Sequence, residues 1–161
     1  MADWSNKELL KFYEFLNALD RKNELPCKLD LKKLYKDINR GLLFDSSIPK
    51  GYGVGSSGAL VASIYSSYAI NGLRSDGNVS NASILKLKKI FSELEAYFHG
   101  KSSGLDPLIC YLNLPILIKS KNHWMINGKN WAINNTSTTY LNKIFLPKAV
   151  AQLFPTPLII F

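Results

Sequence analysis

The residues best suited to chemistry form a glycine-rich run followed by two serines. The glycines at alternate positions are Gly51, Gly53 and Gly55. Ser56 and Ser57 follow directly, at the start of an apolar stretch with helical spacing. Because glycine has no Cβ and tolerates positive φ, such a loop can turn its N–H groups inward around an anion. The next helix, expected over residues 56–70, would add unpaired N–H groups and a partial positive charge. The pattern indicates a phosphate-binding loop.

Other interpretations of this loop depend on its surroundings. The spacing from Gly53 to Gly58 also fits the dinucleotide pattern G-x-G-x-x-G, but that pattern needs a buried strand running into its first glycine. Pro49 and Lys50 intervene here, and Asp76, the nearest acidic candidate for a ribose contact, lies in a turn. No Gly-Lys-Ser/Thr follows the loop, so the Walker pattern is absent. The alternative that this segment is a glycine-rich turn, which caps a core helix and binds no ligand, stays open.

A second segment places two carboxylates on either side of a short glycine-containing loop. Apolar residues spaced by threes and fours predict a helix whose buried stripe is Ile84, Leu87, Phe91, Leu94 and Phe98. Glu95 lies beside this stripe, at the edge of the expected core, where a carboxylate could reach a cation. The loop that begins after this helix ends at Asp106.

These residues also have purely structural interpretations. Asp106 precedes a proline and an apolar run, as expected of a helix N-cap. Glu95 would be a solvated helix residue if it paired with Lys88 or Lys89. His99, near a helix C-terminus, would serve as a dipole partner or a core hydrogen-bonding residue.

The two segments together resemble the kinase superfamily named for galactokinase, homoserine kinase, mevalonate kinase and phosphomevalonate kinase (GHMP). Residues 49–57 match its phosphate-loop pattern P-x-x-x-G-L-G-S-S, with Val54 in place of the leucine. Gly58 stands where the family usually has alanine. Residues 95–106 resemble the pattern E-x-x-x-H-G-x-x-S-G-x-D of the mevalonate kinase branch, with Ser102 where proline is common.

The resemblance implies phosphoryl transfer from MgATP to the hydroxyl of a small-molecule alcohol, with mevalonate as the expected acceptor. Ser57 and Glu95 would bind Mg²⁺, which prefers hard oxygen ligands. Asp106 would accept the proton of the substrate hydroxyl or orient that hydroxyl. His99 and Ser103 are assigned to the acceptor pocket. The residues assigned to ATP are Pro49, Lys50, Gly51, Gly53, Val54, Gly55, Ser56, Ser57 and Gly58.

Local patterns around these segments predict alternating helices and strands. A first helix is expected over residues 5–19, opened by a Ser5–Glu8 capping box. A second is expected over residues 30–38, capped by Asp30 and closed by Gly41. Further helices are expected from residue 56 to near Gly72, around Glu95, and over residues 107–112. Strands are expected over residues 42–45, 114–120, 123–126 and 129–133, the last two joined by an Asn127-Gly128 turn. We therefore expect an α+β fold, an incomplete version of the ribosomal protein S5 domain 2-like N-terminal domain of these kinases.

The resemblance extends over roughly residues 5–121. Two further family motifs, one in N-terminal strands and one in a C-terminal domain, are not found in the sequence. We expect residues 1–133 to be a partial ATP-binding domain, the C-terminal domain to be largely missing, and residues 134–161 to be an unassigned tail, disordered or frame-shifted. A truncated gene product or gene-model fragment would explain this. A catalytically inactive nucleotide-binding remnant is then the alternative to an active kinase.

Composition fits one globular domain: 161 residues, 47% hydrophobic and 20% charged. The net charge of +8 is spread along the chain without a basic block interleaved with aromatics, so we expect no nucleic-acid partner. No apolar run is long enough to span a membrane. Cys27 and Cys110 lie in no metal-ligand spacing and are interpreted as reduced thiols of a cytoplasmic protein. The sequence does not indicate an oligomeric state.

Overall fold

The computed structural model describes residues 2–44, 56–73 and 79–113, together with the backbone of three short strands. Within this part of the chain there are five helices and three strands. They are α1 (Ala2–Arg21), α2 (Leu31–Asn39), α3 (Ser56–Tyr68), α4 (Asn81–His99), α5 (Leu105–Leu112), β1 (Ile116–Ser120), β2 (His123–Ile126) and β3 (Ile144–Phe145).

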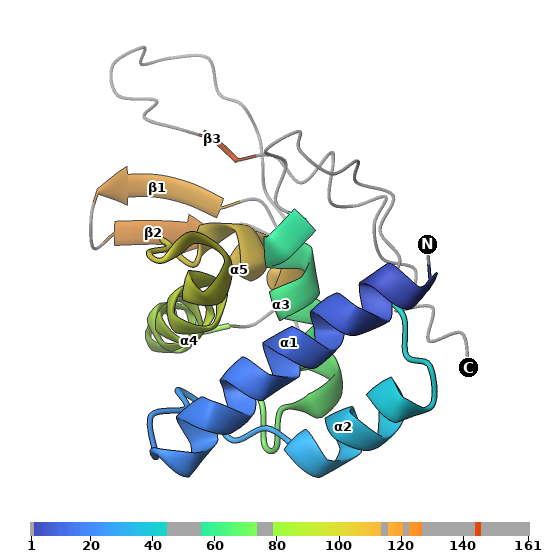
Figure 1. Ribbon diagram of the computed structural model, residues 1–161. Coiled ribbons are helices and arrows are strands. Elements are labelled where there is room, and N and C mark those ends of the chain that lie inside the picture. Colours follow the sequence, from blue (N-terminus) through green and yellow to red (C-terminus); the bar gives the residue numbers. More distant parts are fainter. Residues whose placement is uncertain are drawn as a thin grey trace.

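Helix α3 lies at the centre of the helical part, with α2 on one side and α4 and α5 on the other (Figure 1). Its composition explains this place, because α3 is apolar around most of its circumference. Its buried residues are Gly58, Ala59, Leu60, Val61, Ala62, Ile64, Tyr65 and Tyr68. A helix that is apolar on all sides has to be covered on all sides. The N-terminus of α3, which carries the two serines, is therefore held in a fixed place by its neighbours.

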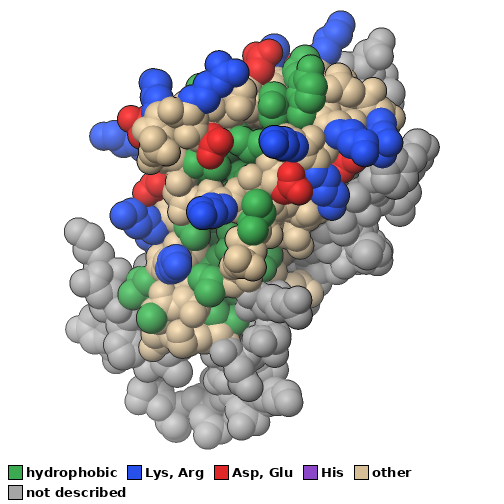
Figure 2. All heavy atoms as spheres, turned by 90° about the horizontal axis from the view of Figure 1, so that it is seen from below, with side chains coloured by type: hydrophobic (Ala, Val, Ile, Leu, Met, Phe, Trp, Pro, Cys, Tyr) green, Lys and Arg blue, Asp and Glu red, His purple; other side chains and the backbone are tan. Residues whose placement is uncertain are grey.

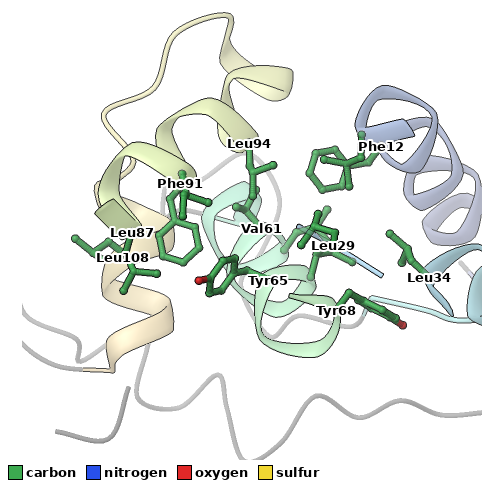
Figure 3. Packing of buried hydrophobic residues seen from close by; sticks show 14 of the residues in the cluster. Phe12, Leu29, Leu34, Val61, Tyr65, Tyr68, Leu87, Phe91, Leu94 and Leu108 are labelled. Atoms are coloured by element: carbon green, nitrogen blue, oxygen red, sulfur yellow. The ribbon is translucent and has the colours of Figure 1, made fainter. Parts of the chain in front are cut away.

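One hydrophobic core joins all five helices (Figure 3). Fully buried members from α1, α2, α3, α4 and α5 are Phe12, Leu34, Val61, Phe91 and Leu108. The stripe predicted for α4 is confirmed: its first four residues are buried, and Phe98 packs against the core while partly exposed. Each such buried side chain contributes on the order of 1.5 to 3 kcal/mol to the burial free energy.

Hydrogen bonds to the backbone determine where α2 begins and where α3 ends. The predicted Asp30 cap is confirmed, since its Oδ1 accepts from the backbone N–H of Lys33 at 2.9 Å. Helix α3 ends at Tyr68 rather than near the expected Gly72. The reason is that residues 68–70 turn to pair with residues 28–30, and the Asp30 N–H donates to the Tyr68 carbonyl at 2.7 Å.

Helix α1 begins before the predicted capping box. It starts at Ala2, so Ser5 is an interior helical residue and the capping prediction is wrong. Glu8 instead forms an exposed ion pair with Lys11, at 2.9 Å.

The sheet of the described residues is smaller than the α+β interpretation expected. Residues 42–44 form no strand, because the N–H of Leu42 completes the end of α2 by donating to the Asp37 carbonyl at 2.9 Å. Strands β1 and β2 occupy the expected segments and pair antiparallel, with Ile116 opposite Ile126. Strand β3 pairs with the other edge of β1, giving the order β2-β1-β3. The predicted Asn127-Gly128 turn and the strand at 129–133 lie outside the described residues.

The charges on the visible face agree with the interpretation of a solvated surface. Figure 2 shows lysine and arginine side chains spread over this face, with aspartate and glutamate between them. Among the residues that the structure describes, no helix is both long and apolar enough to cross a membrane.

Candidate functional site

The first residue of the candidate site along the described chain is Ser57, at the second position of α3. The first turn of a helix leaves its backbone N–H groups unpaired within the helix, and its dipole end is positive. Ser56, Ser57 and Gly58 all lie in this turn. The other residues assigned to ATP, at positions 49–51 and 53–55, lie outside the described part of the chain.

Glu95 reaches the α3 N-terminus from α4. Its side chain is only 3% exposed, and Oε1 accepts a hydrogen bond from the Ser57 hydroxyl at 3.2 Å. Its other oxygen, Oε2, accepts a short hydrogen bond from the Ser102 hydroxyl. The interpretation of Glu95 as a solvated residue paired with Lys88 or Lys89 is therefore wrong. The helical stripe brought Glu95 to the edge of the core, and packing of α3 against α4 then buried it.

The environment of the Glu95 carboxyl favours its protonated form. Burial raises its pKa above the ordinary value, and the nearby charge of Asp106 raises it further. Hydrogen bonds from Ser102 and Ser57 and the proximity of His99 act in the opposite direction. Burial is the largest of these effects, and a cation beside Glu95 would act in the opposite direction by lowering the pKa.

His99 follows Glu95 by one helical turn and lies on the same face of α4. Its Nε2 is 2.9 Å from the Ser57 hydroxyl oxygen. When Ser57 donates its single proton to Glu95, the contact with His99 is completed by the tautomer that carries a proton on Nε2. In a serine hydrolase the acid orients the histidine instead of accepting from the serine, so this arrangement differs from a catalytic triad. His99 thus touches the residue assigned to the cation, and its assignment to the acceptor pocket stays a prediction.

Asp106 lies in the first turn of α5 and is exposed. Gly104, in the left-handed region, precedes the helix without a side-chain cap, so the interpretation of Asp106 as an N-cap is wrong. Helix α5 approaches α3 closely here: a Cβ on Gly58 would lie 2.8 Å from the Asp106 Cβ. Asp106 therefore stands directly beside the helical turn that carries Ser57.

The loop between α4 and α5 supplies one residue that the sequence patterns did not assign. Ser103, which they did assign, is exposed, and its hydroxyl accepts from the Leu105 N–H at 3.3 Å. Ser102 is the residue that reaches the site, through Glu95. The sequence did contain a sign of this contact: a serine stands where proline is common, and it places a hydroxyl seven residues after Glu95.

The cysteines have no part in this chemistry. Neither Cys27 nor Cys110 forms a disulfide. Burial raises the pKa of the Cys110 thiol to about 12, with the charges of Asp106 and Glu95 adding to the effect. The thiol is therefore protonated at neutral pH and is a poor nucleophile.

The donors gathered here suit a phosphate-bound cation. Ser57 and Glu95 present a hydroxyl and a carboxylate oxygen 3.2 Å apart, at a helix N-terminus. Among the described residues, no group of three or more histidine, cysteine or acidic side chains could hold a metal ion alone. Mg²⁺ is commonly held by one or two protein oxygens, with water and substrate phosphates completing the shell. The residues present fit that mode.

The family model described as GHMP kinases N terminal domain matches residues 11–113. The chain belongs to this family. The matched region contains α2, α3, α4 and α5, and therefore the segments that carry Ser57, Glu95, His99 and Asp106. No curated protein and no solved structure gives a significant match to the chain.

Gly104 and Gly100 form a matched pair that tests how the loop is packed. Both have φ of 70°, but a Cβ on Gly104 would lie 2.2 Å from the Lys88 carbonyl oxygen, whereas one on Gly100 meets nothing within 4 Å. Gly100→Ala should cost only the strain of a side chain at positive φ, about 1 to 3 kcal/mol, at a ψ of −45° compared with 11° for Gly104. Gly104→Ala should cost about 1 to 3 kcal/mol more, because the backbone of α4 must give way. Urea denaturation measures both, and equal costs would contradict the packing described.

The buried carboxyl of Glu95 should give a specific pH dependence of stability. A raised pKa means that the folded state binds this proton more tightly than the unfolded state. The free energy of unfolding should therefore fall as the pH rises from the ordinary carboxyl pKa, about 4.3, through the higher folded pKa. Glu95→Gln removes this contribution, so the variant should lose less stability than the wild type over that window. Parallel stability curves for the two proteins would show that Glu95 does not titrate in this way.

Proposed function

We propose that this GHMP kinase chain transfers the γ-phosphoryl group of ATP to the hydroxyl of a small-molecule alcohol. The observation that carries the proposal is the meeting of three elements: the N-terminus of α3 with Ser57, the buried Glu95 of α4, and Asp106 in the first turn of α5. Phosphoryl transfer depends on positioning and charge neutralisation more than on covalent chemistry by the protein. These three elements offer both.

Ser57 and Glu95 would hold the Mg²⁺ of MgATP, on the side where Glu95 Oε1 and the Ser57 hydroxyl already lie together. The cation, when bound, would neutralise charge on the phosphate oxygens. The N–H groups in the first turn of α3, which have no partner within the helix, add donors for the same oxygens. The glycine-rich loop at residues 49–55, on the sequence pattern, supplies the rest of the phosphate cradle.

Asp106 would act on the acceptor. Its carboxylate is exposed and adjacent to the helical turn of Gly58 and Ser57, so an alcohol beside Asp106 would also be beside the bound phosphate. Asp106 accepts the hydroxyl proton, or holds that hydroxyl in line with the γ-phosphorus. His99 and Ser103 are proposed to contact the acceptor. The mevalonate-like pattern at residues 95–106 supports mevalonate as the first acceptor to test, and a cytoplasmic site of action accompanies that proposal.

Nucleotide binding and turnover separate the roles of these residues. Titration calorimetry of MgATP should show binding by the wild type and by Asp106→Asn, with weaker binding by Ser57→Ala and Glu95→Gln. Removal of a single ligand or of its partner commonly lowers metal affinity by about 10- to 100-fold. Acceptor-dependent ADP release should then fall at least about 100-fold in Asp106→Asn, the usual range for loss of a general base.

Matched controls lie on the same helices. Ser66→Ala changes an exposed serine of α3, and Glu93→Gln changes an acidic residue of α4 two positions before Glu95. Both should bind MgATP like the wild type. A folded wild type without MgATP binding would overturn the proposal. Binding without ADP release from any alcohol would instead support the inactive nucleotide-binding alternative.

A further inference from the structure

Ser102 is held by three hydrogen bonds in the loop between α4 and α5. Its hydroxyl donates to Glu95 Oε2 and accepts from the Gly104 N–H at 3.0 Å. Its carbonyl accepts from the Ser92 hydroxyl at 2.5 Å. Ser92 and Glu95 are one turn apart on α4, so the same face of this helix binds both the backbone and the side chain of Ser102. The hydroxyl of Ser102 is therefore fixed in place and aimed at Glu95.

Because of the contact with Ser102, the two carboxylate oxygens of Glu95 face different elements. Oε2 is bonded to the loop through Ser102, whereas Oε1 faces Ser57 on α3. With the carboxylate held at both oxygens by donors on different elements, its rotation about the terminal bond is restricted. A cation that binds beside Ser57 then meets Oε1, while Ser102 holds Oε2 turned towards the loop.

We propose that Ser102 is a positioning residue that keeps Glu95 a one-oxygen ligand and thereby favours MgATP over CaATP. The inference deepens the proposed function and rests on it. Mg²⁺ is small and demands near-octahedral geometry, whereas the larger Ca²⁺ readily takes both oxygens of a carboxylate. A carboxylate whose second oxygen is bonded elsewhere suits the smaller ion. Proline, which is common at this position in the pattern that residues 95–106 resemble, has no hydroxyl to make this contact.

The test compares the affinities of two metal complexes of a non-hydrolysable ATP analogue, the β,γ-imido form. Calorimetry is run with excess Mg²⁺ or excess Ca²⁺ on the wild type, Ser102→Ala, Ser102→Val and Ser102→Thr. Threonine keeps the hydroxyl, whereas valine has nearly the same shape without it. We expect alanine and valine to weaken the magnesium complex by about 10- to 100-fold, as for other residues that orient a ligand, and the calcium complex by less. Threonine should restore the wild-type ratio.

Ser92→Ala separates ligand positioning from loop stability. It removes the bond to the Ser102 carbonyl but leaves the hydroxyl that contacts Glu95. Its melting temperature should fall while the ratio of magnesium to calcium affinity stays the same. If Ser102→Ala does not fold, the valine and threonine pair decides the question.

The outcomes distinguish this inference from the function on which it rests. An unchanged ratio in the alanine or valine variant, with magnesium and calcium complexes weakened equally or not at all, overturns the role of Ser102. The proposed function would survive that result. If the folded wild type binds neither complex, the proposed function fails and the role of Ser102 fails with it.

Discussion

The buried carboxyl group of Glu95 is the constraint on which the arrangement of the site depends. A carboxylate that is 3% exposed is costly to bury unless its oxygens are hydrogen-bonded. The donors come from two different elements, Ser57 of α3 and Ser102 of the loop. Any shift of α3 or of the loop away from α4 would leave one oxygen without its partner. The hydrogen bonds therefore couple the positions of three segments that are distant in the sequence.

Close backbone packing brings the remaining carboxylate to the same place. Helix α5 can lie against α3 only because Gly58 has no side chain, and the loop can lie against α4 only because Gly104 has none. Two residues with no chemistry of their own thus determine where Asp106 stands relative to Ser57. The apolar surface of α3, covered by its neighbours, gives this packing its stability.

The sequence predicts most of the helical part because its signals are local. The stripe of α4 and the Asp30 cap depend on residues within one or two turns of each other. The errors arise where distant contacts override those signals. Tyr68 ends α3 early because its carbonyl pairs with a segment more than thirty residues away, and Leu42 is drawn into the end of α2 instead of a strand.

The same distinction applies to the site. Glu95 and Asp106 are assigned to the site because their spacing follows a known pattern, whereas the contact of Ser102 with Glu95 depends on how the loop folds back on α4. No spacing rule anticipates a hydrogen bond between a loop serine and a helix carboxylate. The contact of His99 with Ser57 likewise requires two helices to meet, which periodicity alone does not show.

The most direct test of the account is to locate the metal–nucleotide complex on the folded chain. Mn²⁺ can replace Mg²⁺ with ATP, and its unpaired electrons broaden NMR signals of nearby backbone amides. The account predicts the strongest broadening at Ser57, Glu95 and Asp106. It also predicts a decrease along α3 towards Tyr68, about 16 Å further along the helix axis. Broadening that is strongest near Tyr68, or none at all in the folded protein, would contradict a phosphate site at the start of α3.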